Sequence, residues 1–148
     1  LPICGFMLRS AFPVVALRRP VIFRHLFRAG MRNQEALRQA AIPVERIQGP
    51  VLLVSGGDDH VWPADDMSKA IVARLRENRF PHAVEHLHYP RAGHMLRYPF
   101  LPTTSRNSRN AHLRNARFSY GGTPEADAKA QAESWPRTIA FFRESFRE

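Results

Sequence analysis

The distribution of apolar and polar positions divides the chain into a few regular elements separated by irregular stretches. Residues 51–55 form a continuous apolar run rich in β-branched side chains, which is typical of a strand buried on both faces. Residues 64–78 repeat apolar side chains every four positions from Met67 to Leu75, which predicts an amphipathic helix. Residues 83–89 have the character of a second strand. Strand, helix and strand over this length predict a parallel βαβ unit with a right-handed crossover.

The flanking regions have weaker patterns. Residues 1–20 contain three prolines and no sustained period, so we expect irregular structure there. Residues 31–40 are rich in good helix formers and are followed by Pro43, which predicts a short helix. Residues 99–122 are polar, rich in Arg, Asn and Ser, and without a period, so this stretch is interpreted as a long irregular excursion.

The C-terminal residues 124–147 are again helical in pattern. Their aromatic-rich stripe is expected to pack back on the sheet; its members are Trp135, Ile139, Phe142 and Phe146. Pro136 lacks a backbone N–H and clashes with the preceding turn in a helix interior. We therefore expect a kink or a second helix at this point, with Ser134 as its N-terminal cap.

Length and composition predict one domain in a reducing environment. The 148 residues suffice for a single core of ordinary size. The first residue is Leu1, no signal peptide is recognisable, and the chain looks cut from something longer. No apolar stretch approaches the ~20 residues of a membrane-spanning helix, so we expect a soluble protein. A lone cysteine, Cys4, favours a reducing, cytoplasmic location over a disulfide framework.

The net charge of +9 raises the question of a nucleic-acid partner. Of the 22 cationic side chains 20 are Arg, and the excess lies within residues 1–48 and 105–122, which have the character of loops or connectors. Neither an aromatic-basic strand motif nor a paired Cys/His zinc spacing accompanies it. We therefore expect no nucleic-acid partner.

Chemistry-bearing residues follow both predicted strands. Gly56-Gly57-Asp58-Asp59 comes after the first strand, and Gly93-His94 comes after the second. The carboxyl ends of parallel strands are where an open sheet gathers its ligand and catalytic groups. An acid after one strand and a histidine after the next is also the order in which α/β-hydrolases supply the last two members of a nucleophile–acid–base triad. Gly56 and Gly57 are interpreted as residues with positive φ that let the chain leave the first strand in a sharp turn.

Asp59 and His94 are the predicted catalytic residues. Asp59 can accept a hydrogen bond from one imidazole nitrogen of His94, which leaves the other nitrogen to take a proton from a nucleophile. Asp59 is preferred to Asp58 because it stands three residues after Gly56, a Gly-x-x-Asp spacing found in many hydrolases. Asp58 is left with a supporting or turn-forming role. Asp-Asp and Gly-His pairs also occur in ordinary turns, so their joint placement after consecutive strands carries the prediction.

Other candidates fit less well. His86 and His88 share one face of the second strand, but the sequence places no third metal ligand, so a structural role is preferred and no metal is predicted. Cys4 lacks the glycines two positions away that a nucleophile elbow requires, because Pro2 and Phe6 stand there. Ser10 is likewise not preferred as a nucleophile.

Four motifs follow one another from about Ala40 onward: AIPVERIQGPVLLVSGGDDHVWP, HLHYPRAGH, YPFLPTT, and YGGTPEADAKAQAESW with a closing Phe-Phe helix. In this order they resemble the C-terminal catalytic part of the acyl-CoA thioesterase and bile acid-CoA:amino acid N-acyltransferase family, particularly its bacterial members. The resemblance implies an α/β fold, namely the C-terminal portion of an α/β-hydrolase. It also implies an acyl-CoA substrate, with no separate cofactor, attacked by a Ser or Cys nucleophile. Asp59 and His94 match the family's acid and base.

The nucleophile itself is not recognised in this sequence. No Gly-x-Ser-x-Gly or Gly-x-Cys-x-Gly occurs, and the elbow should lie two βα units before the acid, which is more than ~60 residues upstream. The expected organisation is therefore a variable, irregular segment over residues 1–40 and an incomplete α/β-hydrolase domain over residues 41–148. On its own the chain is expected to be inactive.

Two alternative functions stay open. The first is a different α/β-hydrolase esterase, dienelactone-hydrolase-like or peptidase-like, which shares the acid and base but not the Gly-Gly-Thr-Pro-Glu segment at residues 121–125. The second is a non-catalytic, basic interaction module that uses the Arg-rich stretches. If the arginines of residues 105–118 are functional, we expect them to bind the phosphates of coenzyme A; they are Arg106, Arg109, Arg114 and Arg117.

Overall fold

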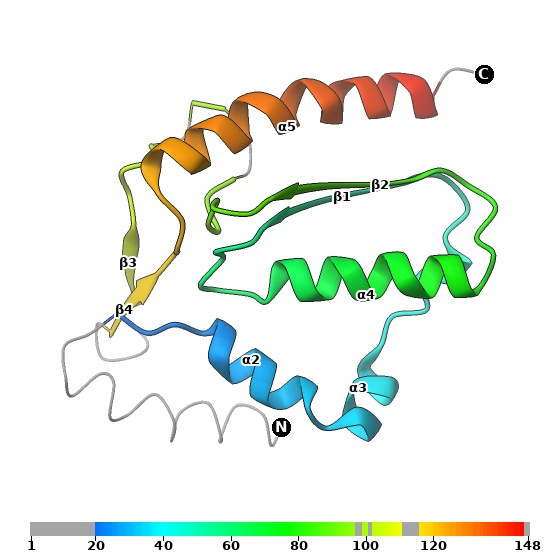
Figure 1. The fold of residues 1–148 in the computed structure, drawn as a ribbon, viewed down its shortest axis with the longest axis horizontal. Helices are drawn as coiled ribbons and strands as arrows, with labels where there is room; N and C mark the ends of the chain where they lie inside the picture. The colour runs from blue at the N-terminus through cyan, green and yellow to red at the C-terminus, as the bar shows by residue number, and fades with distance from the viewer. Residues whose placement is uncertain (1–19, 97–98, 101, 111–115, 147–148) are drawn as a thin grey trace.

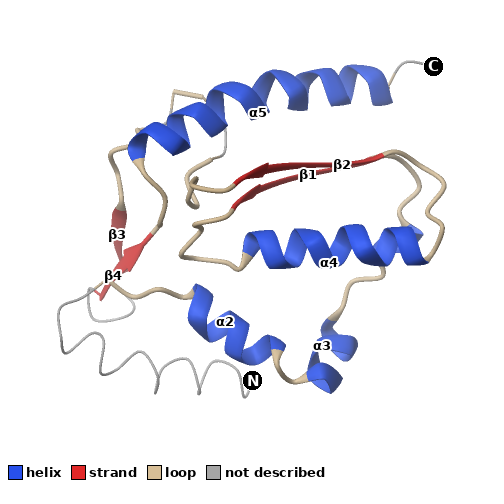
Figure 2. Cartoon of the chain, viewed as in Figure 1, coloured by secondary structure: helices blue, strands red, loops and turns tan. Residues whose placement is uncertain are grey.

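The computed structural model describes residues 20–96, 99–100, 102–110 and 116–146. A parallel strand pair lies between two long helices, with two short helices and a small antiparallel pair beside them (Figure 1 and Figure 2). The elements in chain order are α2 Arg24–Met31, α3 Gln34–Ala40, the 3-10 turn η1 Val44–Arg46, β1 Val51–Gly56, α4 Ala64–Glu77, β2 Val84–Tyr89, β3 Asn107–Asn110, β4 Ala116–Ser119 and α5 Pro124–Ser145. Among the described helices, none is both long and apolar enough to cross a membrane.

The predicted βαβ unit is confirmed. β1 pairs in parallel with β2, and the register runs from Val51 opposite Val84 to Gly56 opposite Tyr89. In Figure 1, α4 and α5 lie on opposite sides of this pair. Within the described residues β1 is paired on one side only, and the first four residues of β1 are half-buried instead of buried on both faces as predicted.

The register determines which side chains face which helix. Residues opposite each other in a parallel pair point to the same face, so Ser55 lies beside His88. Both histidines of β2 point toward α4, where His88 approaches Asp65. Glu85 points the other way and forms an ion pair with Arg137 of α5. The two helices therefore meet chemically different faces of one strand.

The N-terminal described segment is more helical than expected. The short helix predicted over residues 31–40 is present as α3, and the Asn33 side chain caps it by accepting a hydrogen bond from Ala36 N–H. α2 was not predicted, although Phe23, Leu26 and Phe27 have helical spacing. The irregular structure expected for residues 1–20 lies almost entirely outside the described residues.

The expectation of an irregular excursion over residues 99–122 is wrong in part. β3 and β4 form an antiparallel pair in which Asn107 is opposite Ser119. Their residues lack apolar alternation, so the pattern gave no strand signal. The pair is anchored by Phe118, which is buried, bridges to Val21 and stacks on Phe23 with ring centroids 4.6 Å apart.

α5 is one continuous helix that passes through Pro136. The predicted second helix is therefore wrong, and Ser134 is a buried interior residue instead of a cap. The cap is Thr123, whose hydroxyl accepts from Ala126 N–H. Pro136 deprives the carbonyl of Ala132 of its helical donor, but both residues lie on the exposed side, where water can replace that donor.

α5 packs back on the strand pair as predicted, but with a different stripe of residues. Four residues at helical spacing are buried in α5: Asp127, Ala130, Gln131 and Ser134. The predicted aromatic stripe is largely outside this contact, since Phe142 is 50% and Phe146 78% exposed. The polar buried stripe has partners in the loop after β2, and these partners shape the site described next.

Candidate active site

The site forms where β1 and β2 end. β1 ends at Gly56 and β2 at Tyr89, and because the strands are parallel their C-terminal ends lie at one edge of the sheet. Asp59 follows three residues after the first strand end, and His94 follows five residues after the second. The sequence predicted that these loops would meet, and they do.

Asp59 and His94 are in hydrogen-bond contact. The Nδ1 atom of His94 lies 3.0 Å from Oδ2 of Asp59. Asp59 is only 5% exposed, and the imidazole of His94 is 19% exposed. In this arrangement Nδ1–H donates to the carboxylate, which assigns the tautomer in which Nε2 carries a lone pair. The predicted contact is therefore present, and it selects Asp59 over Asp58.

The carboxylate of Asp59 is oriented by its own loop. Its second oxygen, Oδ1, accepts hydrogen bonds from the backbone N–H groups of Val61 at 2.7 Å and Trp62 at 3.0 Å. Such an aspartate turn is common after a strand. Here it has a further consequence, because both acceptor oxygens are used and the side chain is held with Oδ2 toward the imidazole. The turn-forming interpretation therefore applies to Asp59, and the same turn orients its carboxylate toward His94.

His94 is positioned by the segment that precedes α5. The backbone N–H of His94 donates to the carbonyl of Tyr120 at 2.8 Å, and the two rings stack with centroids 5.9 Å apart. One residue earlier, Gly93 N–H donates to Oδ1 of Asp127 at 2.6 Å. Asp127 is fully buried and also receives a 2.6 Å hydrogen bond from Arg106. The loop before α5, residues 120–123, is the third loop of the site. Together with Asp127 of α5 it fixes the histidine from outside the βαβ unit.

Two glycines allow this third loop to approach so closely. Gly121 and Gly122 have φ values of +70° and +66°, in the left-handed region that favours glycine. A Cβ on Gly122 would also lie 2.7 Å from the Asp127 carboxylate. Positive φ was predicted at Gly56 and Gly57 instead, and this prediction is wrong: among the described glycines, those with positive φ are in the segment before α5.

Asp58 has a separate set of partners. Its Oδ2 accepts from Gly122 N–H at 2.9 Å, and its Oδ1 lies 3.1 Å from Nε2 of His60 and 3.4 Å from Arg24. His60 in turn contacts the hydroxyl of Ser119 at 2.8 Å. Asp58 therefore ties the β1 loop to the third loop, in keeping with the supporting role predicted for it.

A shallow cavity of about 500 Å³ lies beside these loops. Its wall includes Asp58 and Thr123 together with three arginines, Arg24, Arg28 and Arg91.

The arginines that line this cavity are not those predicted to bind phosphate from the sequence. Arg106 is committed to Asp127, Arg109 and Arg117 lie opposite each other on the β3–β4 pair, and Arg114 is outside the described residues, as are Cys4 and Ser10.

The structure also supplies a neighbour that the sequence did not place. His86 and His88 of β2 face Asp65 at the start of α4, so the pair of histidines has a carboxylate within reach. Sequence reasoning likewise missed Asp127, Arg106 and the Tyr120 segment as supports of His94. Tyr120 and Asp127 lie in the motif YGGTPEADAKAQAESW, which carried no role for either residue, and Arg106 lies outside all four motifs.

Comparison with known proteins gives a consistent family. Residues 17–148 match the family model described as "BAAT / Acyl-CoA thioester hydrolase C terminal". The match begins well before Ala40, where the resemblance in the sequence became evident. The parallel strand pair flanked by helices agrees with the C-terminal portion of an α/β-hydrolase.

Curated relatives carry the names of acyl-CoA thioesterases. The chain is 33% identical over 110 residues to acyl-coenzyme A thioesterase 6 of Mus musculus, covering 74% of this chain and 26% of that protein. It is 34% identical to the mitochondrial acyl-coenzyme A thioesterase 2 of Mus musculus, covering 71% and 22%. It is 32% identical to the peroxisomal succinyl-coenzyme A thioesterase of Mus musculus, covering 68% and 23%. The chain thus spans about a quarter of the length of the relatives it matches.

Proposed function

The chain belongs to the family of BAAT and acyl-CoA thioester hydrolase C-terminal domains, and we propose from this that it supplies the acid and the base for cleavage of an acyl-CoA thioester. In this proposal Asp59 is the acid and His94 the base. The observation that carries it is the 3.0 Å contact between buried Asp59 Oδ2 and His94 Nδ1 at the C-terminal edge of a parallel strand pair.

The proposed chemistry uses the two nitrogens of His94 differently. Nδ1–H donates to Asp59, so Nε2 accepts the proton of a Ser or Cys nucleophile as that nucleophile attacks the thioester carbonyl. As the carbon–sulfur bond breaks, Nε2–H returns this proton to the coenzyme A sulfur, and the acyl group stays on the nucleophile. Water or an amine then attacks this acyl-enzyme and gives a proton to Nε2, which returns it to the nucleophile as the acyl–nucleophile bond breaks. Asp59 stabilises the imidazolium that forms during each step without itself taking the proton.

The nucleophile in this proposal comes from outside these 148 residues. The sequence contains neither Gly-x-Ser-x-Gly nor Gly-x-Cys-x-Gly, and it spans about a quarter of its relatives' lengths. A nucleophile, a base and an oxyanion hole must stand in one constellation for thioester cleavage. The isolated chain is therefore proposed to have no turnover above background, whereas the full-length protein that carries it is active.

The arginine-lined cavity is proposed to hold the phosphates of coenzyme A. Arg24 and Arg28 of α2 and Arg91 of the loop after β2 line it, next to the turn that carries Asp59. Arg24 also contacts Asp58 and Arg28 pairs with Asp66, so the proposal depends most on Arg91. Guanidinium groups bind phosphate oxygens in a bidentate manner. Arg91→Ala is expected to raise KM for acyl-CoA about tenfold with a smaller change in kcat. Arg109→Ala, on the β3–β4 pair, serves as the matched control and should leave KM nearly unchanged. A larger increase in KM for Arg109→Ala than for Arg91→Ala would instead place the phosphates at the β3–β4 pair.

The deciding experiment is release of free coenzyme A from an acyl-CoA by the full-length protein. His94→Ala is expected to lower kcat by at least about a thousandfold, because the base is removed. His25→Ala, an exposed histidine of α2, is the control and should keep normal turnover. A fully active His94→Ala protein would reject His94 as the base. Hydrolysis of simple esters but not of acyl-CoA would favour the alternative esterase assignment.

A further inference from the structure

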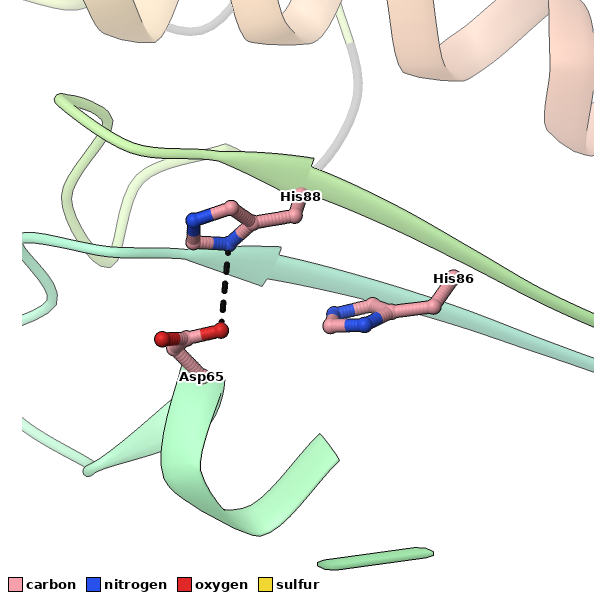
Figure 3. Close-up of side chains that lie close together, drawn as sticks. All are labelled: Asp65, His86 and His88. Carbon is pink, nitrogen blue, oxygen red and sulfur yellow. Dashed lines mark ion pairs between the residues drawn. The ribbon is translucent and has the colours of Figure 1, made fainter. Parts of the chain in front are cut away.

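A second cluster of ligand-type side chains lies between α4 and the strand pair. Asp65 projects from the first turn of α4 toward His86 and His88, which stand two residues apart on the α4-facing side of β2 (Figure 3). One ligand atom from each of the three residues lies within 4.8 Å of those of the other two. Among the described residues, no other group of three such side chains is this compact.

The Asp65 carboxylate has an unsatisfied oxygen that faces the histidines. Oδ2 receives a 2.7 Å hydrogen bond from Lys69, one helical turn further along α4. Oδ1 is buried and makes no hydrogen bond, although it lies 3.2 Å from Nδ1 of His88. Oδ1 thus has the ion-pair contact with His88 but receives no hydrogen bond, and a buried carboxylate oxygen in that state carries a desolvation cost that a bound cation would offset.

The histidines present nitrogens to the same space. Ser55 is 1% exposed, and its hydroxyl oxygen lies 2.7 Å from Nε2 of His86 and 3.4 Å from Nδ1 of His88. Asp65 and Ser55 both approach the same nitrogen of His88. An imidazole of a catalytic triad must bridge acid and nucleophile with its two different nitrogens, so this cluster is not a second hydrolytic site.

From this geometry we propose that Asp65, His86 and His88 bind a divalent transition-metal ion of the zinc class, with a water molecule completing the coordination. Two imidazoles and one carboxylate form a donor set suited to zinc. Metal bonds of ~2.0–2.1 Å in a tetrahedral site separate neighbouring ligand atoms by ~3.3 Å. The 3.2 Å between Asp65 Oδ1 and His88 Nδ1 already matches this spacing, while the ligand atom of His86, which lies within 4.8 Å of the other two, would have to move closer on binding.

One oxygen of the Asp65 carboxylate remains available to an ion. Lys69 occupies only Oδ2, which leaves Oδ1 for the ion.

The ion would have a structural role. The loop between β1 and α4 carries Asp59, and it runs from the end of the strand that pairs with β2 to the helix turn that carries Asp65. A metal bound by Asp65, His86 and His88 therefore cross-links both ends of the α4 crossover. This cross-link would hold the acid loop without touching the Asp59–His94 pair. The proposal is independent of the catalytic roles, since metal binding is measured without substrate.

The test is a titration of the metal-free, full-length protein with Co²⁺, followed by its visible d–d absorption and by displacement with Zn²⁺. One equivalent of Co²⁺ is expected to bind to a tetrahedral or five-coordinate site. Asp65→Ala and His86→Gln are each expected to lower the Co²⁺ affinity at least about 100-fold. Loss of a residue that only supports a metal ligand costs ~10–100-fold, and loss of a ligand itself should cost at least as much as the upper end of that range. Gln at position 86 retains a polar group toward Ser55, which favours retention of the fold.

Two control variants locate the ion. His25→Gln and His94→Gln should each bind Co²⁺ like the unaltered protein. Loss of binding in His94→Gln with retention in His86→Gln would move the ion to the catalytic pair and overturn the proposal. Absence of stoichiometric binding, or unchanged binding in both cluster variants, would also overturn it.

A measurement on the unaltered protein does not depend on the folding of any variant. Zn²⁺ should protect His86 and His88 from modification by diethyl pyrocarbonate, while exposed His25 stays reactive. Equal reactivity of His86 and His88 with and without Zn²⁺ would contradict the proposed site.

Discussion

Two carboxylate–imidazole groups lie within one βαβ unit, and they differ in how their members are held. Asp59 and His94 belong to loops, and backbone N–H groups fix both: Val61 and Trp62 orient the carboxylate, and the Tyr120 carbonyl receives the N–H of His94. Asp65 belongs to a helix, and His86 and His88 belong to a strand. Their polar contacts given above are all with other side chains. Regular elements bring the second group together, whereas three loops are needed for the first.

The difference also decides what each group can do. In the loop pair, every oxygen of Asp59 has a donor, and one nitrogen of His94 stays available for proton transfer. In the α4–β2 cluster, an oxygen of Asp65 lacks a hydrogen bond and two imidazoles converge on it. An acid–base pair whose carboxylate oxygens all receive hydrogen bonds is suited to proton transfer. A carboxylate oxygen without a hydrogen bond, with two imidazoles beside it, is suited to binding a cation.

The largest expected effect separates the two neighbouring aspartates of the first group. Asp59→Asn in the full-length protein should lower kcat for acyl-CoA by about a thousandfold or more, because the amide favours the wrong imidazole tautomer. Asp58→Asn keeps its size and can still accept from Gly122, so a loss of less than about tenfold is expected. Coenzyme A release measures both, and equal losses would remove the distinction between the two residues.

The backbone support of His94 should have a large effect on stability. Asp127→Ala removes the acceptor for Gly93 N–H and leaves Arg106 without its buried partner. We expect a decrease of about 3 kcal/mol in the free energy of unfolding, measured by urea denaturation. Lys129→Ala, exposed on the same helix, should stay within about 0.5 kcal/mol. If the two variants were equally stable, the contacts of Asp127 with Gly93 and Arg106 would not be an energetic support of the site.

The start of α5 provides a smaller test of the same loop. Thr123 caps the helix directly after Gly122, and Thr123→Ala should cost about 1 kcal/mol of unfolding free energy. Thr104→Ala, an exposed threonine outside the helices and strands, is the control with an expected change below about 0.5 kcal/mol. A neutral Thr123→Ala would indicate that packing of the buried stripe alone fixes the beginning of α5.

The α4–β2 cluster should produce a modest pH dependence in metal-free protein. His86 has a lowered pKa in the folded chain because of burial and its neighbour His88, so below pH ~6.5 the unfolded chain binds more protons than the folded one. Stability should therefore rise with pH up to ~6.5 and fall as the pH drops below it. His88, Asp65 and Lys69 are the other charged groups around this imidazole, and Ser55 is its neutral neighbour.

Urea denaturation at about pH 7.5 and about pH 5.5 measures this dependence across the ~6.5 titration range of imidazole. His86→Gln should show a flatter response than the unaltered protein, and His25→Gln an unchanged one. A response in His86→Gln as steep as in the unaltered protein would assign the pH dependence to other groups.

The sequence predicted the elements whose patterns are local and periodic. β1, α4, β2 and most of α5 follow from apolar spacing, and the meeting of Asp59 with His94 follows from parallel strands ending at one edge. The β3–β4 pair lacked any such pattern, because its polar residues depend on one buried aromatic, Phe118.

The supports of the site depend on contacts between distant segments, which no local pattern encodes. Asp127 meets Gly93 across 34 residues, and Asp65 is separated from His86 by a helix and a turn. The predicted cap at Ser134 was wrong because Pro136 lies on the exposed side of α5, where a missing hydrogen bond costs little. The phosphate role predicted for Arg106 conflicts with its ion pair to buried Asp127.

The central claim is that Asp59 holds His94 in the tautomer whose Nε2 serves as the base, and ¹⁵N NMR of histidine-labelled full-length protein tests it most directly. The spectrum is recorded at about pH 8.5, well above the ~6.5 at which imidazole titrates, and His94 is identified by its absence in His94→Gln. The account predicts a protonated Nδ1 and an unprotonated Nε2, with loss of this preference in Asp59→Asn. A protonated Nε2 in the unaltered protein, or a tautomer unaffected by Asp59→Asn, would contradict the account.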